Sequence, residues 1–91
     1  MYHLLLYELA DDYLERRPAY RAEHLALAGQ LHERGVLRLG GAFADPADGA
    51  ALVFEADDAG VVEDFVRRDP YVVHGLVKSW RVREWTVVVG G

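Results

Sequence analysis

Two ionisable residues, His24 and Asp69, occupy positions of the sequence where apolar residues would be expected. On a helical wheel, His24 falls at the centre of an apolar stripe made of Tyr20, Leu27, Ala28 and Leu31. Asp69 follows Phe65 and Val66 at helical spacing, which puts it on the inward stripe of a second helix. A carboxylate beside a histidine fixes the tautomer of the imidazole and stabilises the imidazolium. The spacing therefore predicts a His24–Asp69 pair capable of general acid–base chemistry.

Each of the two residues also has a structural interpretation. His24 could be a core histidine that is satisfied by one or two hydrogen bonds. Asp69 precedes Pro70 and is a good N-cap for a short helical turn over "PYVVHG". The two roles of Asp69 are compatible, because backbone N–H groups at a helix start stabilise an ionised carboxylate. We expect His24 and Asp69 to lie within hydrogen-bond reach of one another.

Three further residues are candidates for substrate binding. Arg21, one helical turn before His24, could hold an anionic substrate or could be a solvated cation. Tyr71 could donate a proton, form a wall of the pocket or serve in packing alone. Gly41 is expected where a Cβ would crowd the pocket or where φ disfavours other residues. The other histidines form no H-x-x-x-H pair, so neither a metal site nor a cofactor is expected; they are His3, His32 and His74.

The elements that must position these residues follow the order β-α-β-β-α-β. Strands are expected over residues 2–9, 36–43, 50–56 and 77–85. The first helix is expected from near Pro18 to before Gly35, and the second after a cap at Asp57 or Asp58. The turn "ADPADG" should join the two central strands as an antiparallel pair. This order predicts an α+β, ferredoxin-like fold with both helices on one face of a single sheet.

The first strand is apolar on both of its faces. Leu4 and Leu6 point one way, and Leu5, Tyr7 and Leu9 point the other way. The face of the sheet that carries no helix therefore needs a cover, and a second copy of the chain is the simplest one. The hydrophobic fraction of 52% is high for a monomer of this size, so a homodimer is expected.

Length and composition exclude several classes of protein. A chain of 91 residues indicates one domain over residues 1–91. The net charge of −5 gives no basic surface for nucleic acid or anionic membrane. The absence of Cys excludes disulfides, thiolate catalysis and zinc–thiolate sites. No apolar run reaches the ~20 residues of a membrane span and no secretory signal is visible, so a cytoplasmic location is expected.

The segments "YRAEHLALAGQLHERGVLRLGGAF" and "DPYVVHGL", with a last strand ending in Trp85, resemble the YciI-like (YCII-related) family of small α+β barrel proteins. The most distinctive residues are Arg21-x-x-His24-Leu25, Gly41 and Asp69-Pro70-Tyr71, in this order. The resemblance implies a dimeric α+β barrel with an active site on a His-Asp pair, here His24 and Asp69. Some relatives are associated with elimination or isomerisation of hydroxylated or chlorinated aromatic compounds. The "ADPADG" turn is shorter than in many relatives, which also carry a proline after the glycine that Gly41 matches, so the substrate class is not transferred.

Three functions are compatible with these residues. The first is a cofactor-independent lyase or isomerase, in which His24 is the general base or acid on a small hydroxylated ring compound and Asp69 orients it. The second is a non-catalytic protein that binds a small metabolite in the same pocket. The third, a cofactorless oxygenase or haem-binding protein, depends on fold analogy alone. Saturable binding without product would distinguish the second from the first.

Overall fold

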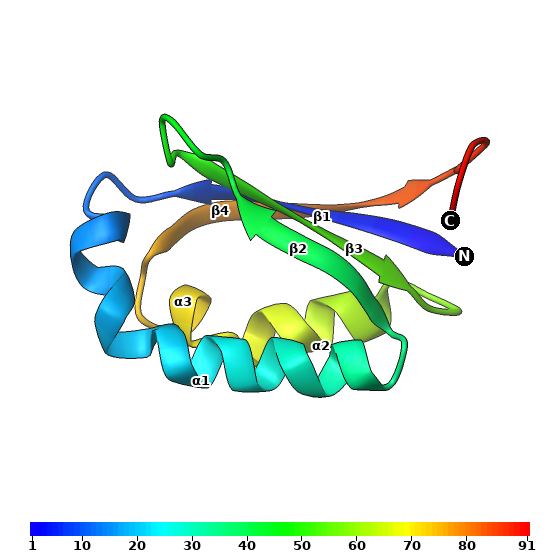
Figure 1. Ribbon diagram of the computed structural model, residues 1–91, viewed down its shortest axis with the longest axis horizontal. Coiled ribbons are helices and arrows are strands. Elements are labelled where there is room, and N and C mark those ends of the chain that lie inside the picture. The colour runs from blue at the N-terminus through cyan, green and yellow to red at the C-terminus, as the bar shows by residue number, and fades with distance from the viewer.

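The computed structural model describes residues 1–91 (Figure 1). The elements in chain order are β1 (Tyr2–Leu9), α1 (Tyr13–Glu33), β2 (Leu37–Ala42), β3 (Gly49–Glu55), α2 (Gly60–Arg68), α3 (Pro70–Val73) and β4 (Val77–Trp85). The four strands form one antiparallel sheet in the order β2-β3-β1-β4. All three helices lie on one face of this sheet (Figure 1). The predicted ferredoxin-like α+β fold is confirmed.

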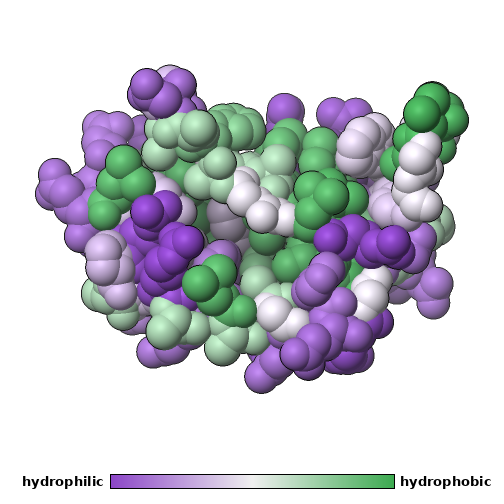
Figure 2. Space-filling model, viewed as in Figure 1, coloured by the Kyte–Doolittle hydropathy of each residue, from purple (hydrophilic) through white to green (hydrophobic).

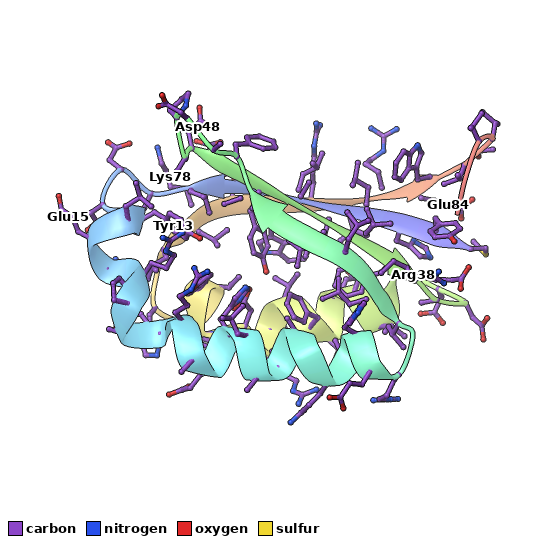
Figure 3. All side chains as sticks on the ribbon, viewed as in Figure 1. Tyr13, Glu15, Arg38, Asp48, Lys78 and Glu84 are labelled. Carbon is purple, nitrogen blue, oxygen red and sulfur yellow. The ribbon has the colours of Figure 1, made fainter.

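The two faces of the sheet differ in burial. Leu5 and Tyr7 are buried beneath the helices, and their cross-strand partners in β3 are Leu52 and Ala50, which share that face. Leu4 and Leu6 point to the opposite face and are only half-buried. Side chains stand on this helix-free face with no element above them (Figure 3). The core therefore lies between the sheet and the helices, and one face of the sheet is left uncovered.

The prediction that α1 begins near Pro18 is wrong, because the helix begins at Tyr13 and contains Pro18. Proline has no N–H to donate and its ring crowds the preceding turn, so a helix bends at such a position. Figure 1 shows that α1 changes direction early in its course. The extra N-terminal turn is held by Tyr13, which is buried and packs edge-on against Tyr71, with ring centroids 5.6 Å apart. Tertiary packing thus overrides the local start signal.

The other end of α1 is as predicted. Gly35 follows the helix with φ of 76°, a conformation that favours glycine. Its N–H donates to the carbonyl of His32 at 2.9 Å, which closes the last turn. No helix of the protein combines the length and the hydrophobicity that crossing a bilayer requires.

The start of α2 differs by a residue or two from the predicted cap. The N-cap position is Ala59, whose side chain cannot accept a hydrogen bond. Asp58 supplies the acceptor instead, since its Oδ1 receives the N–H of Gly60 at 2.7 Å. The predicted inward stripe of α2 is buried: Val62, Phe65 and Val66. This stripe anchors α2 on the sheet and fixes the place of the residue that follows the helix, Asp69.

Candidate active site

Asp69 lies at the junction between α2 and α3 and is completely buried. Its φ of −67° and ψ of 118° are extended, which is the preferred conformation of a residue before proline. The carboxylate Oδ1 accepts a hydrogen bond from the backbone N–H of Tyr71 at 3.1 Å. The predicted N-cap role is confirmed, with Pro70 in the first turn of α3. Capping holds this carboxylate in one orientation beneath α1.

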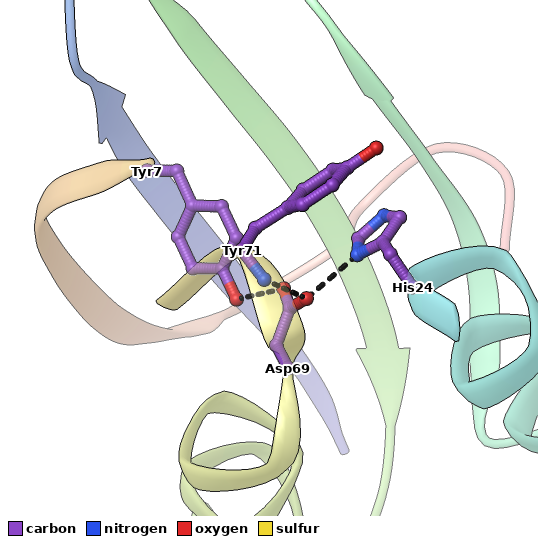
Figure 4. A network of polar contacts seen from close by, with 4 residues as sticks. All are labelled: Tyr7, His24, Asp69 and Tyr71. Atoms are coloured by element: carbon purple, nitrogen blue, oxygen red, sulfur yellow. Dashed lines mark hydrogen bonds and ion pairs between the residues drawn. The ribbon is translucent and has the colours of Figure 1, made fainter. Parts of the chain in front are cut away.

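His24 and Asp69 are in direct contact, as the helical spacing predicted. His24 Nδ1 lies 2.7 Å from Asp69 Oδ1, and the His24 side chain is 15% exposed. An ionised carboxylate only accepts hydrogen bonds, so the bonded nitrogen Nδ1 carries the proton. Figure 4 shows the second ring nitrogen of His24 pointing away from Asp69. In this tautomer Nε2 has a free lone pair and can accept a proton.

Tyr7 completes the surroundings of Asp69 and was missed in the sequence. Its hydroxyl donates to Asp69 Oδ2 at 2.8 Å from the inward face of β1 (Figure 4). The buried carboxylate therefore has three partners: the Tyr7 hydroxyl, the Tyr71 N–H and the His24 ring. A buried tyrosine hydroxyl needs a polar partner, and this was the available signal in the sequence. Tyr7 thus contacts His24 only through Asp69.

The Tyr7 phenol gives a testable pH dependence. Burial raises its pKa far above the ordinary value of about 10, and the charge and hydrogen bond of Asp69 raise it further. Above about pH 10 the folded protein keeps a proton that the unfolded chain releases, so stability falls as pH rises. We expect Tyr7→Phe to reduce that slope by about 1.4 kcal/mol per pH unit. Urea unfolding followed by circular dichroism between pH 9.5 and 11.5 measures both slopes.

If Tyr7→Phe kept the slope of the parent, the buried Tyr7–Asp69 hydrogen bond would not exist in solution.

The imidazole of His24 is held between aromatic rings. Tyr71 stacks on it with ring centroids 3.9 Å apart and an interplanar angle of 11°. Phe65 approaches the imidazole edge-on at 6.4 Å. Tyr13, in turn, packs against Tyr71 and supports the stack. The ring of His24 is therefore fixed in plane by stacking and in rotation by Asp69.

A cavity of about 420 Å³ lies between α1 and the β2–β3 side of the sheet and includes His24 in its lining. Figure 2 shows a hollow at the centre of the side of the molecule that faces the viewer, surrounded mostly by hydrophobic residues. Most of the lining is apolar, and the polar lining residues are Tyr7, Tyr13, Arg17, Arg21, His24 and Tyr71. The volume and composition are typical of small-molecule sites. The cavity can accommodate a ring compound beside the imidazole.

Of the predicted substrate-binding residues, Arg21, Tyr71 and Gly41 all border this cavity. The steric expectation for Gly41 is wrong, because a Cβ there would meet nothing within 4 Å and the φ is not positive. The crowded glycine is Gly40, where a Cβ would lie 3.0 Å from the side chain of Leu52. Gly41→Val should therefore not harm folding through a clash within the subunit.

The other histidines lie outside the cavity lining. His32 Nδ1 is 2.8 Å from the carbonyl of Leu37, and His74 stacks on Tyr20. His3 is buried on β1, and neither of its ring nitrogens has a hydrogen-bond partner. No group of three or more His, Asp or Glu side chains is placed to hold a metal ion.

Comparison with known proteins relates this geometry to a family. The family model of the YCII-related domain matches residues 1–86. No curated protein sequence matches the chain. Among solved structures, 5-chloro-2-hydroxyhydroquinone dehydrochlorinase (TftG) from Burkholderia phenoliruptrix AC1100, in complex with 2,5-dihydroxybenzoquinone, is similar over 94% of each chain, with 26% identity and a TM-score of 0.82.

Two more distant structures share the fold alone. A protein of Bacteroides thetaiotaomicron VPI-5482 assigned to the antibiotic biosynthesis monooxygenases is 18% identical, with a TM-score of 0.63 over 100% of this chain and 91% of that chain. The structured domain of Caenorhabditis elegans BMY-1 is 15% identical, with a TM-score of 0.55 over 98% of this chain and 100% of that chain. At such identities neither protein informs the chemistry of the site.

Proposed function

The chain belongs to the family of YCII-related domains, and we propose that it is a cofactor-independent lyase or isomerase that acts on a small hydroxylated ring compound. In this proposal His24 is the general acid–base and Asp69 orients it. The observation that supports it most is the 2.7 Å contact between His24 Nδ1 and Asp69 Oδ1 at the wall of a cavity. The contact leaves Nε2 available to a ligand.

The proposed chemistry is redox-neutral. The reacting form is the keto tautomer of the ring compound, in which the carbon that bears the leaving group is tetrahedral and carries a hydrogen. His24 Nε2 takes the proton of a ring hydroxyl. The electron pair left on that oxygen forms a carbonyl, shifts a ring double bond and expels a leaving group such as chloride. The product is the substrate less HCl, so no electron acceptor is required. The imidazolium then returns its proton to water, or to another ring atom in an isomerisation. Proton transfer by a positioned side chain typically contributes about 10²–10⁴-fold to the rate.

Two features support a ring compound as the substrate. The cavity walls are largely apolar, which suits a flat ring. The solved dehydrochlorinase acts on a chlorinated hydroxyhydroquinone and shares the fold at 26% identity. We propose the same class of compound for this chain rather than the same molecule.

The test is chloride release from 5-chloro-2-hydroxyhydroquinone, measured by ion chromatography under anaerobic conditions with a protein-free blank. We expect release by the protein to exceed the blank and to saturate with substrate. If chlorinated and hydroxylated rings shift the His24 resonances saturably but no product forms, the protein is a binding protein and the catalytic proposal is wrong.

We also propose that the protein is a homodimer through the helix-free face of the sheet. The apolar side chains on that face are Leu4 and Leu6 on β1, their neighbours Ala51 and Val53 on β3, Leu39 on β2, and Trp85 on β4. Leu39 is 68% exposed and Trp85 is 46% exposed. Such a patch on a monomer marks an interaction surface, and a stable interface buries about 800 Å² per partner.

Sedimentation analysis tests the dimer. The parent should sediment at twice the 10.2 kDa of the chain at micromolar concentration. Leu6→Glu, at the centre of the patch, should give monomers, because each subunit would bury a carboxylate in the interface. Val61→Glu makes the same change on the exposed side of α2 and should remain dimeric. A monomeric parent, or a dimeric Leu6→Glu variant, would contradict this interface.

A further inference from the structure

The charged residues that border the cavity are both arginines, Arg17 and Arg21. No Asp or Glu borders it, although the net charge of the chain is −5. Ion pairs to carboxylates within 4.0 Å occupy other cations, namely Arg16, Arg38, Arg67, Arg68 and Lys78. Arg17 instead lies over the ring of Tyr13, with its guanidinium carbon 5.5 Å from the ring centroid. The cavity lining therefore carries two arginine side chains that form no ion pair, and no carboxylate borders it.

A buried hydrogen-bond donor, the Tyr71 hydroxyl, borders the same cavity as the two arginines. Tyr71 is 3% exposed, and its hydroxyl proton has no acceptor. Burial raises the pKa of this phenol and Tyr13 raises it further, whereas the charges of Arg21 and Arg17 and a hydrogen bond from the Arg21 side chain lower it. Both guanidinium groups thus act on the phenol oxygen. A buried hydroxyl whose proton has no acceptor is unfavourable, and an oxygen of a ligand would satisfy it.

We propose that Arg17, Arg21 and the Tyr71 hydroxyl form an oxyanion subsite beside His24, which selects ring compounds that carry an acidic oxygen. On α1, Arg17, Arg21 and His24 follow one another at spacings of four and three residues, so they share one face of the helix. Arg21 and His24 are about 4.5 Å apart along the helix axis. In Figure 4 the Tyr71 hydroxyl and the free nitrogen of His24 both point away from Asp69. A ligand held by its oxyanion would present its ring to Nε2.

The inference rests on the proposed function, in which His24 Nε2 is the reacting nitrogen. It adds that the ligand is a ring compound with an acidic oxygen. A guanidinium group binds carboxylate oxygens in pairs, and a neutral phenol donates one further hydrogen bond. The acidic oxygen can be a carboxylate substituent or an ionised ring hydroxyl. An ionised ring oxygen would also be stabilised here as negative charge develops during proton removal.

Calorimetric titration at pH 7.5 with four probes tests the subsite. Two are anionic at this pH, 2,5-dihydroxybenzoate and 2,5-dihydroxybenzoquinone, and two are their neutral counterparts, 2,5-dihydroxybenzamide and 2,5-dimethoxybenzoquinone. We expect at least one anion to bind about tenfold or more tightly than its neutral counterpart and to shift the NMR resonances of His24. Preference for the benzoate indicates a carboxylate ligand, and preference for the quinone indicates an ionised hydroxyl.

Three substitutions assign the effect to these residues. Arg17→Gln and Arg21→Gln should each weaken binding of the anion by about tenfold, and Tyr71→Phe by about fivefold. Arg34→Gln removes the same charge at the far end of α1, outside this cavity, and should leave the affinity unchanged. The conservative changes keep the exposed helix face and the buried ring, so folding is retained.

The inference is overturned if the neutral probes bind as tightly as the anions, if both Arg variants behave like Arg34→Gln, or if no anion binds at millimolar concentration. It fails separately from the proposed function. Chloride release with normal dependence on His24 but no preference for anions would reject the subsite alone. Anion binding that needs both arginines without any turnover would reject the enzyme alone.

Discussion

Replacing His24 by glutamine is expected to reduce the turnover number for chloride release by about 10²–10⁴-fold. The amide can still donate a hydrogen bond to Asp69, so the buried carboxylate keeps a partner and the fold is retained. The amide cannot accept and release a proton near neutral pH, so the general base is lost. Initial rates over a range of substrate concentrations measure the effect, and circular dichroism verifies folding.

His32→Gln is the matched control for this experiment. His32 lies on the same helix, bonds to the carbonyl of Leu37 and does not border the cavity. Its turnover number should equal that of the parent. If His24→Gln also retained the parent turnover number, His24 would be a core histidine without a catalytic role.

Substitution of Asp69 should have the largest effect on stability. Asp69→Ala leaves the Tyr7 hydroxyl, the Tyr71 N–H and the His24 ring without their common acceptor. Removing one partner of a buried charged hydrogen-bond network costs about 3–5 kcal/mol, which we expect as a lower free energy of unfolding in urea. Asp58→Ala is the control, since it removes an exposed helix-start acceptor and should cost about 1 kcal/mol. Equal costs would mean that the Asp69 network adds nothing beyond capping.

Asp69→Asn separates the negative charge of Asp69 from its capping role. The amide oxygen can still accept a hydrogen bond at the start of α3, so most of the stability should remain. The cap and the His24 contact share Oδ1, so an amide oxygen at that position keeps both of them and the amide nitrogen faces Tyr7. The negative charge that stabilises the imidazolium is lost, so we expect chloride release to fall by about 10²-fold or more. Retention of full activity would show that Asp69 is only a cap.

The sequence predicted the order of the elements and the His24–Asp69 contact because both depend on local periodicity. His24 and Asp69 are polar residues at inward helical positions, and such positions converge in this fold. The extra turn of α1 could not be predicted, since it depends on the packing of Tyr13 against Tyr71, which is 58 positions away. Arg17 was missed as a consequence, because it lies within that turn.

The role of Tyr7 and the position of the crowded glycine both depend on contacts between elements, which the sequence of a single strand does not reveal. Tyr7 points inward like the core residues of β1, and its hydroxyl has a hydrogen-bond partner only because Asp69 follows α2 at this place in the fold. The glycine prediction failed because β2 has an irregularity between Leu37 and Leu39, which shifts the pairing register. Without that shift Gly41 would share the helix-facing side with Leu37, whereas in the structure Gly40 does.

The tautomer of His24 tests the central claim most directly. Long-range ¹H–¹⁵N correlation spectra, recorded at a pH where the four histidine rings are neutral, distinguish the protonated from the free ring nitrogen. We predict the proton on Nδ1 in the parent, with Nε2 free. A parent with its proton on Nε2 would contradict the account of Asp69 as the residue that orients His24.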